Sequence, residues 1–305
     1  MIKNSEILLL YEAKLCNPNG DPDNENKPRI DYSTMTNLVS DVRLKRFIRD
    51  YLYHYKGMDI FIRKEKDGSY LDATERYKQV EEKLGKNDFL IDIKFFGAVI
   101  PIKGSDKKKS DKNQEKESDK KEKGSSIQFT GPIQFSWGYS LNKVELLDSS
   151  SITSHFAGEK KEGGSIGKDW RLKYSLIAFY GRINKYWALK TNLNEDDIKL
   201  FDESIFPAIN FETSTRSKIG HMPILYIRIE YNDDYMLGDL RRFINIDKKE
   251  GIESIKDYKI NIDELLNVLE RIKDKISKVV VKRADEISYL DENLKKFPNV
   301  NFIWN

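Results

Sequence analysis

The chain has 305 residues, of which 39% are hydrophobic and 34% charged, so it is long enough to bury one large core or two small ones. Its net charge of +3 is too small to identify a partner, and a single cysteine, Cys16, excludes an internal disulfide and is typical of a reducing cytosol. The first apolar run, Ile7 to Tyr11, is far shorter than the ~20 residues that span a bilayer, and it lacks the features of a secretory signal. We therefore expect a cytoplasmic protein with no membrane partner.

The first predicted element is a buried strand at Glu6–Leu15, followed by a turn-rich loop at Cys16–Ser33 with Asn-Pro, Asn-Gly and Asp-Pro pairs. A helix is expected at Val39–Tyr55, with Thr36 or Ser40 as its N-cap. Its apolar residues fall on one face, which should pack on a sheet. They are Leu44, Phe47, Ile48, Tyr51, Leu52 and Tyr55.

The opposite face of this helix carries a row of cations that no carboxylate interrupts. The row consists of Arg43, Arg46 and Arg49, with Lys45 at its edge. Because surface helices usually mix charges of both signs, this row is a candidate contact for a polyanion. The alternative is an ordinary solvated helix face.

The middle of the chain contains an insertion at Asp59–Gly85 with a helix at Thr74–Leu84, and predicted strands at Asp88–Pro101 and Ile127–Ser140. Between these strands, Lys103–Lys123 has nine lysines, six acidic residues and no apolar residue. We expect a disordered lysine-rich loop over 103–126, because such a segment cannot bury surface. It is either an insertion or an electrostatic tether for nucleic acid.

The segment from Leu146 to Lys173 is polar, with Gly163-Gly164 between two arms that can pair as a hairpin. A hairpin with so little apolar surface is marginal alone, so we expect this one to project from the body and to be ordered by a partner. The alternative is an exposed hairpin without a ligand.

The remaining elements are predicted at Tyr174–Asn184 (strand), Asn194–Phe206 (helix), Met222–Tyr231 (strand) and Ile262–Val279 (helix). The order of strands and helices predicts an α+β fold, a modified ferredoxin-like βαββαβ unit, as a single domain over residues 1–305. This fold carries many functions, the RNA-recognition motif among them, so it does not identify one.

The chemistry candidates are few. An acidic loop resembles the start of a calcium site, but Asn26 and Tyr32 stand where the turn glycine and the bidentate glutamate belong. The acidic residues are Asp21, Asp23, Glu25 and Asp31, and the three histidines, His54, His155 and His221, lack the spacing of a zinc site. Nucleotide-binding and acyl-transfer motifs are absent. We therefore predict no catalytic residue, no metal and no cofactor, with an aspartate–metal nuclease as the alternative.

Two polar turns are candidate phosphate contacts. Thr213–His221 combines small hydroxyls with Arg216 and Lys218, and Asn17–Gly20 offers backbone amides at a sheet edge. The alternative for both is an ordinary polar turn.

Several motifs together closely resemble the Cas-seven family of CRISPR effector proteins, and most nearly its type I-B branch. They are LCNPNGDPDNENKPRID, VSDVRLKRFIRDYL, FFGAVIP, FTGPIQFSWGYSL, SITSHFA and TRSKIG, spread between Ile7 and Tyr231. The resemblance implies a right-hand shape: a modified RNA-recognition-motif palm, helical finger insertions and a β-hairpin thumb at 146–173. It also implies that several copies line up on one guide RNA, hold it mostly by its phosphates and interrupt its pairing with the target at regular intervals.

The resemblance assigns RNA contacts to four segments. These are Asn17, Asn19 and Gly20 in the first loop; Arg43, Lys45 and Arg46 on the helix; Thr153, His155 and Phe156 at the start of the thumb; and Arg216, Ser217 and Lys218 in the late turn. The predicted set also includes Arg49, Lys168 and Arg171.

The predicted function is that of a CRISPR RNA-binding backbone subunit of a type I-B Cascade surveillance complex in antiviral defence. Its expected partners are the guide RNA, the target DNA strand paired to it, other copies of itself and other Cascade subunits. A subunit that accepts any guide should hold phosphates and leave base edges free, which requires no catalysis. The alternatives are a metal-dependent RNase that uses an acid near Asp21 or Asp31, and a stand-alone module that binds single-stranded RNA.

Overall fold

The computed structural model describes residues 2–63, 72–85, 88–102, 125–154, 165–211 and 216–303, with the backbone alone at 102, 125, 149–154 and 165–167. The predicted loop over 103–126 therefore lies outside the described residues, except for its last two positions, which belong to a strand. The predicted Gly163-Gly164 turn also lies outside them.

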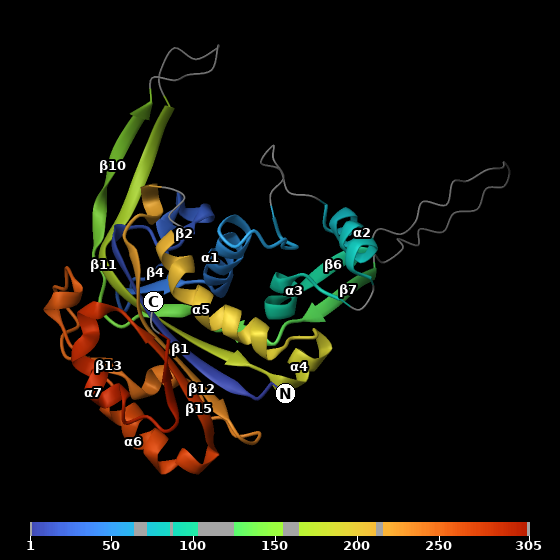
Figure 1. Ribbon diagram of the computed structural model, residues 1–305. Helices are drawn as coiled ribbons and strands as arrows, with labels where there is room; N and C mark the ends of the chain where they lie inside the picture. Colours follow the sequence, from blue (N-terminus) through green and yellow to red (C-terminus); the bar gives the residue numbers. More distant parts are fainter. Residues whose placement is uncertain are drawn as a thin grey trace, which may run out of the picture.

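A sheet of ten strands forms the body of the protein (Figure 1). The strands follow the order β16–β15–β12–β1–β11–β9–β5–β4, and β8 and β10 also pair with β11. Neighbours are antiparallel except β15 and β16, which are parallel. The strands are β1 (Ser5–Cys16), β4 (Ile30–Asp31), β5 (Thr36–Val39), β8 (Ile133–Phe135), β9 (Gly138–Ser140), β10 (Leu146–Ser154), β11 (Ser165–Ile183), β12 (His221–Tyr231), β15 (Ile276–Arg283) and β16 (Val300–Phe302).

Strand β1 lies in the middle of this sheet, between β11 and β12. Its side chains alternate between two cores: Ile7 and Leu9 belong to one, and Leu8 and Leu10 to the other. A strand covered on both faces is apolar at nearly every position, which explains its continuous apolar run. The structure confirms this predicted strand.

Two long helices, α1 (Asp41–His54) and α5 (Glu195–Phe211), cover one face, and the short α4 (Lys185–Lys190) precedes α5. Helix α5 is held to the sheet by a buried ion pair. Arg228 on β12 donates through Nε and Nη2 to the two carboxylate oxygens of Asp202, at 2.8 and 2.7 Å. Both side chains are almost fully buried, so the pair fixes α5 against β12.

The C-terminal part of the chain packs on the other face and forms the second core. Its elements are β13 (Asn245–Ile246), β14 (Ile260–Asn261), α6 (Asp263–Arg271) and α7 (Asp291–Leu294), with 3-10 turns at Leu240–Phe243, Ile255–Asp257, Lys273–Lys275 and Asp285–Leu290. The prediction of one helix over Ile262–Val279 is wrong beyond Arg271. The β-branched run that follows forms β15 instead, because such residues favour strands and the edge of β12 supplies its hydrogen-bond partners.

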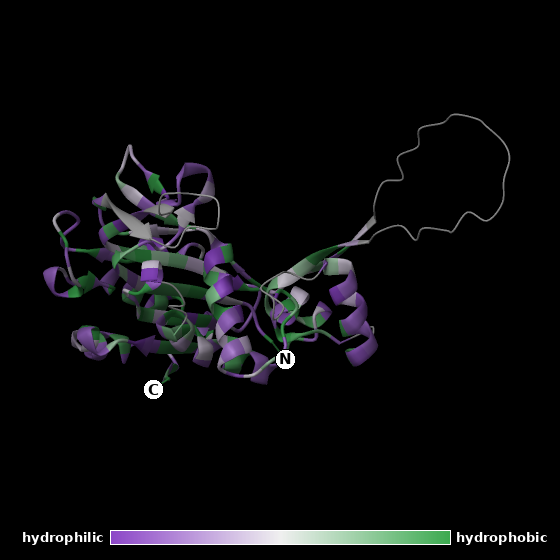
Figure 2. Cartoon of the chain, turned by 90° about the horizontal axis from the view of Figure 1, so that it is seen from above, coloured by the Kyte–Doolittle hydropathy of each residue, from purple (hydrophilic) through white to green (hydrophobic). Residues whose placement is uncertain are grey.

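A smaller unit stands beside the sheet, with its own core of Phe61, Val80, Leu90, Ile93 and Ile100. It consists of α2 (Ala73–Leu84), α3 (Ile91–Phe96), β6 (Gly97–Ile102) and β7 (Ser125–Thr130). Figure 2 shows that α2 is mostly hydrophilic, whereas hydrophobic residues run along the strands of the main sheet. The helix over Thr74–Leu84 is confirmed.

The predicted strand at Asp88–Pro101 is wrong in its first half, because residues 91–96 form α3. Asp92 anchors this helix by accepting hydrogen bonds from the backbone N–H groups of Phe61 and Ile62, at 2.8 and 3.1 Å. The helix ends at Gly97, whose φ of 73° suits glycine. A distant loop therefore decides the structure of this segment.

The predicted strand at Ile127–Ser140 is divided into β7, β8 and β9. Strand β7 pairs with β6 in the smaller unit, whereas β8 and β9 pair with β11 in the main sheet. The chain crosses between the two sheets at Gly131, where a Cβ would lie 2.1 Å from the carbonyl carbon of Phe96. The Gly-Pro pair marks this crossing.

The two arms of the predicted hairpin pair as expected, from Leu146 opposite Leu172 to Ser154 opposite Ser165. The paired arms project from the sheet (Figure 1). Strand β11 continues without a break from the hairpin into the sheet, where its second half forms the core strand predicted at Tyr174–Asn184.

Candidate nucleic-acid interface

A pocket of about 410 Å³ lies where the first loop, α1, the base of the hairpin and the turn before β12 meet. Its lining residues are mostly polar and come from segments that are far apart in the sequence. They are Asn17, Asn19, Gly20, Asn26, Arg43, Lys168, Asp169, Trp170, Ser217 and Lys218, and we call this site the polar pocket. The fold thus brings together seven of the predicted RNA-binding residues; Asn26, Asp169 and Trp170 were not predicted.

The first loop is fixed in place by hydrogen bonds to the late turn and to itself. The backbone N–H of Asn17 donates to the carbonyl oxygen of Ser217 at 2.8 Å, and its side-chain amide donates to the carbonyl oxygen of Asn26 at 2.6 Å. At Gly20 a Cβ would lie 2.8 Å from that Asn26 oxygen, so a larger residue does not fit. The loop contains the short pair β2 (Gly20–Asp21) and β3 (Lys27–Pro28), joined through the 3-10 turn Pro22–Asn24.

Asn19 connects this loop to the start of α1. Its side-chain oxygen accepts hydrogen bonds from the backbone N–H of Ser40 at 2.8 Å and from the Ser40 hydroxyl at 2.9 Å. Ser40 is the N-cap residue, as one of the two predicted alternatives, but its own side chain does not cap the helix. Asn19 therefore positions the helix start beside the pocket.

Lys218 is a partly buried cation of the pocket. It ends the 3-10 turn Arg216–Lys218, and its amino group donates to the carbonyl oxygen of Asn17. Burial, followed by the positive charge of Arg43, lowers the pKa of Lys218 to about 8. A bound anion would stabilise the charged form of this lysine, which makes the site suited to phosphate.

His221 lies behind Lys218 at the start of β12 and is 3% exposed. Burial, with Lys218 and Arg43 as further causes, lowers the pKa of His221 to about 3, so the ring is neutral near pH 7. It packs edge-on against the rings of Tyr11 and Phe47. The histidine is therefore a neutral ring in the core, and neither of its nitrogens has a hydrogen-bond partner among the described residues.

The carboxylate of Asp169 is shared by two arginines from the predicted set. Arg171 donates to it through Nε at 2.8 Å, and Arg216 lies 3.1 Å from the same oxygen. These two arginines line a neighbouring pocket, also of about 410 Å³, together with Glu12, Lys14, Leu15, Ile219, Gly220 and Met222. The hairpin base and the late turn are thus joined by one carboxylate.

Trp170 lines the pocket but is not among the predicted RNA contacts. Its indole N–H is buried and has no hydrogen-bond partner among the described residues. The ammonium of Lys27 lies 4.5 Å from the ring centroid. The indole N–H can therefore donate a hydrogen bond to a ligand in the pocket. The Lys27 ammonium makes a cation–π contact with the ring from β3 of the first loop.

The expectation that the cations of α1 point outward in an uninterrupted row is wrong. Lys45 is 7% exposed and contacts Asp41 at 3.0 Å and the side-chain oxygen of Gln134 at 2.7 Å. Arg49 is also 7% exposed and lies 3.3 Å from Asp92 of α3. The smaller unit covers this side of the helix and supplies the carboxylate that the local sequence lacks.

Arg46 is paired as well, since its Nε donates to Asp50 one turn later at 2.7 Å. Arg43 is the one cation of the fully described helix α1 that lines the polar pocket, and its guanidinium lies 4.2 Å from the Phe47 ring centroid. The predicted apolar face is buried as expected except at Tyr55, which is 55% exposed.

The predicted thumb contacts are placed only in part. Thr153 is in β10, where the backbone alone is described, and His155 and Phe156 lie outside the described residues. Lys168, on the opposite arm, lines the polar pocket and forms an ion pair with Glu25 at 2.8 Å. The first loop is therefore held against the hairpin base.

The acidic residues of the first loop are engaged locally. Asp21 pairs with Arg29 at 3.1 Å. Asp31 accepts hydrogen bonds from Ser33 and Thr34, which lower its pKa. No group of three or more side chains able to hold a metal ion occurs in the part of the chain that the structure describes. Among those same residues, no helix is long and apolar enough to cross a membrane.

Comparisons with known proteins agree with this geometry. A family model described as CRISPR-associated protein Cas7 matches residues 3–263. A protein of Haloferax volcanii, named CRISPR-associated protein Cas7, is 34% identical over 300 residues, covering 90% of this chain and 85% of the relative.

Two solved structures have a similar fold. One, titled "CRISPR RNA-guided surveillance complex", has a TM-score of 0.50 at 13% identity and covers 92% of this chain and 89% of its own. The other, titled "CRISPR RNA-guided surveillance complex, pre-nicking", has a TM-score of 0.52 at 11% identity and covers 99% of this chain and 96% of its own. With the family model matched over most of its length, this chain belongs to the Cas7 family.

Proposed function

We propose that this protein is a guide-RNA-binding backbone subunit of a type I CRISPR surveillance complex of the I-B branch. Several copies assemble along one guide, bind the other subunits of the complex and present the guide for pairing with target DNA. The observation that carries the proposal is the polar pocket, in which four distant segments place cations and amides around the enclosed ammonium of Lys218.

The pocket is suited to a phosphate rather than to a base edge. Its cations are Arg43, Lys168 and Lys218, and its neutral donors include the Trp170 indole. Such donors hold a backbone without reading sequence, which is what a subunit for many different guides needs. The one lining carboxylate, Asp169, is shared between Arg171 and Arg216.

The fold supports the division into palm, fingers and thumb. Strands β12–β1–β11–β8 are adjacent in that order, and α1 and α5 cover one face, the arrangement of a βαββαβ ferredoxin-like palm. The unit around α2 and α3 takes the place of the fingers, and the hairpin at 146–173 that of the thumb.

Of the α1 cations, we assign the guide contact to Arg43, because it is the one that lines the polar pocket. Lys45, Arg46 and Arg49 already pair with Asp41, Asp50 and Asp92, so a role in RNA binding would require them to exchange these partners. Arg49 holds α1 to Asp92 of the smaller unit, whereas Lys45 and Arg46 pair with carboxylates of α1 itself.

We propose no catalytic role. The rival function, a metal-dependent RNase, would need Asp21 or Asp31 to leave its present partners. Incubating the protein with a labelled guide–target duplex and magnesium tests this directly. Cleavage that disappears in Asp21→Asn or Asp31→Asn would favour the nuclease.

The central experiment measures guide affinity against salt for Arg43→Ala combined with Lys168→Ala. Losing two phosphate contacts should flatten the plot of log affinity against log salt by ~1.4 units, equally for unrelated guide sequences. The matched control is Lys273→Ala with Lys295→Ala, which removes two cations paired with Glu270 and Glu292 at the surface. A slope equal to that of the control would refute the pocket as the guide site.

A second experiment separates a backbone subunit from a stand-alone RNA-binding module. Replacing residues 151–167 by a short Gly-Ser link leaves the pocket-lining Lys168 and Trp170 in place. Electron microscopy of protein assembled on a guide should then show loss of regular subunit spacing. Unchanged spacing would show that the hairpin is not a thumb.

A further inference from the structure

Trp137 is a large aromatic side chain that the proposed phosphate site does not use. It follows β8 and directly precedes β9, and it is 48% exposed. The guanidinium of Arg29 lies 5.9 Å from its ring centroid. A half-exposed indole with a cation at its ring has the composition of a stacking platform for a planar, electron-rich group.

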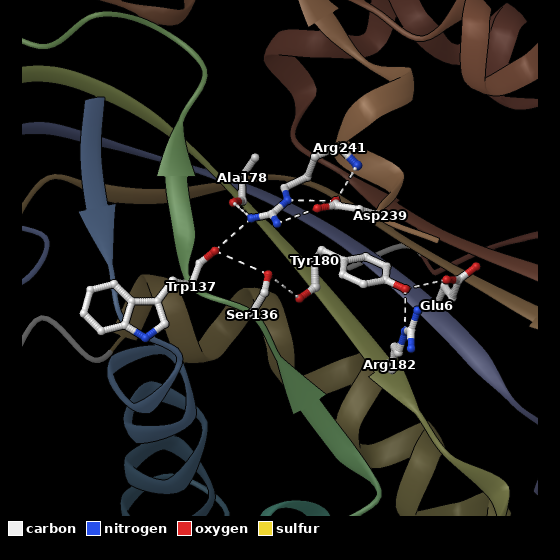
Figure 3. A network of polar contacts seen from close by, with 8 residues as sticks. All are labelled: Glu6, Ser136, Trp137, Ala178, Tyr180, Arg182, Asp239 and Arg241. Atoms are coloured by element: carbon white, nitrogen blue, oxygen red, sulfur yellow. Dashed lines mark hydrogen bonds and ion pairs between the residues drawn. The ribbon is translucent and has the colours of Figure 1, made fainter. Parts of the chain in front are cut away.

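The backbone that carries this indole is held by a buried polar network (Figure 3). Arg241 donates to the carbonyl oxygen of Trp137 at 2.8 Å and forms an ion pair with Asp239 at 2.6 Å. The backbone N–H of the adjacent Ser136 donates to the carbonyl oxygen of Tyr180 at 2.9 Å. In the figure the carbonyl of Trp137 points into the network and its indole points away from it.

The network is itself tied to the centre of the sheet. Glu6 on β1 is fully buried and accepts hydrogen bonds from the hydroxyls of Tyr180 and Tyr231 and from the backbone N–H groups of Leu237 and Gly238. This fixes the segment that carries Arg241. The exposed ring is therefore held on a rigid base, so a ligand that stacks on it loses little entropy in ordering the protein.

Two connections link the strand end that carries Trp137 to the polar pocket. Strands β5 and β9 pair Val39 with Gly138, so Trp137 is one step beyond this pair, beside Ser40. Ser40 is held by Asn19, a lining residue of the pocket. Arg29 makes the second connection, since its backbone N–H donates to the carbonyl oxygen of Asn19 at 3.2 Å.

We propose that Trp137, with Arg29, is a base-stacking site for the same single-stranded RNA whose phosphate occupies the polar pocket. The proposal rests on the function proposed above and adds a contact to the face of a base. Stacking uses the face and leaves the pairing edge free, so it is compatible with any guide sequence. A protein side chain is the competing occupant; the adjoining cationic pocket and the Arg29 guanidinium favour a nucleotide.

The test compares two single-stranded probes of equal length, an oligoadenylate and an oligomer whose residues lack bases. Trp137→Ala should weaken oligoadenylate binding roughly tenfold, with an unchanged salt slope, and leave the abasic probe unaffected. Trp137→Phe should retain most of the affinity and serves as the variant with a preserved ring. Trp187→Ala, which removes an exposed indole on α4, is the matched control and should change neither probe.

Equal weakening on both probes, or on neither, overturns the stacking site. Unchanged probe binding with weaker self-association of the RNA-free protein would assign Trp137 to a protein interface and would also overturn it. The Arg43→Ala and Lys168→Ala pair separates the two proposals. If the double variant weakens RNA binding and Trp137→Ala does not, only the stacking site is refuted. If neither variant weakens RNA binding, the proposed function is refuted as well.

Discussion

Replacing Lys218 by methionine should make the protein more stable while it weakens RNA binding. In the folded protein, burial and the neighbouring Arg43 lower the pKa of Lys218 from 10.5 to about 8. Near pH 7 this shift corresponds to a cost of about 3 kcal/mol for keeping the ammonium charged in the pocket. Methionine removes the charge but also the hydrogen bond from the charged ammonium to the Asn17 carbonyl oxygen, which contributes about 1.5–2 kcal/mol.

The free energy of unfolding of Lys218→Met should therefore rise by roughly 1–2 kcal/mol, and the melting temperature by several degrees. The sign of the pH dependence follows from the same shift. Between about pH 8 and 10.5 the unfolded chain holds the Lys218 proton more tightly than the folded protein does. Because of Lys218, the free energy of unfolding of the wild type should therefore rise with pH in this window. The methionine variant should lack this rise.

RNA binding should change in the opposite direction. Removing one phosphate contact should reduce affinity about tenfold and the salt slope by ~0.7 units. A bound phosphate should raise the pKa of Lys218 back to its ordinary value. Above pH 8 the free protein has lost this proton, so RNA binding by the wild type should be accompanied by uptake of one proton. Its affinity should then fall by up to roughly tenfold per pH unit, whereas Lys218→Arg should bind independently of pH in that range.

The assay is fluorescence anisotropy at constant ionic strength with an oligonucleotide of adenine and cytosine alone, because uracil and guanine lose protons at the top of this range. Thermal unfolding of the same samples supplies the stability. A methionine variant that is less stable than wild type but binds RNA normally would show that Lys218 is a structural lysine, and the reasoning would be refuted. Wild-type affinity that does not change between pH 7 and 9 would refute the proton linkage.

Three further variants test contacts that hold α1 and α5 in place. Asn19→Ala should lower the free energy of unfolding by about 1–2 kcal/mol in urea, because the start of α1 loses its acceptor, whereas Asn19→Asp should preserve it. Arg49→Met should lower stability by about 2–3 kcal/mol because Asp92 loses its cation, with the salt slope of RNA binding unchanged; a reduced slope would place Arg49 on the RNA. Asp202→Asn should cost about 3–5 kcal/mol by leaving Arg228 buried without its anion, and a loss below ~1 kcal/mol would contradict the clamp between α5 and β12.

The elements with a strong local pattern could be predicted from the sequence. Strand β1 has apolar residues for two cores, α1 has an apolar stripe at helical spacing, and the sequences of the two hairpin arms are polar segments that pair as predicted. In each case burial and local propensity favour the same structure. The family assignment could be predicted from the motifs, three of which form the first loop, α1 and the late turn that meet at one pocket.

Predictions failed where a distant partner decides the structure. The apolar run of α3 suits a strand or a helix, and hydrogen bonds from Phe61 and Ile62 to Asp92 stabilise the helix. The spacing that predicts a long helix after Ile262 continues into residues that form β15, because the edge of β12 is open to them. A window of neighbouring residues contains neither partner.

The prediction of an uninterrupted row of cations on α1 failed for a similar reason, because it did not account for the carboxylates that pair with them. Asp41 and Asp50 lie at the ends of the row, where i,i+4 pairing neutralises Lys45 and Arg46, and Asp92 reaches Arg49 from another helix. Lys218 shows the reverse case. Its polar turn could be predicted as a phosphate contact, whereas the burial of its ammonium beside the Asn17 carbonyl oxygen depends on the distant first loop.

Strand β11 connects the pocket directly to the hairpin, because it contributes residues to both. Its 19 residues run from the hairpin through the pocket lining, Lys168 to Trp170, into the buried centre of the sheet beside β1. No turn separates these parts, so the orientation of the hairpin and the positions of Lys168 and Trp170 are set by the same backbone. A phosphate that binds these two residues therefore restricts the hairpin, and a neighbour that restricts the hairpin must strengthen phosphate binding by the same free energy. Assembly along the guide and affinity for the guide are then expected to be coupled through this strand.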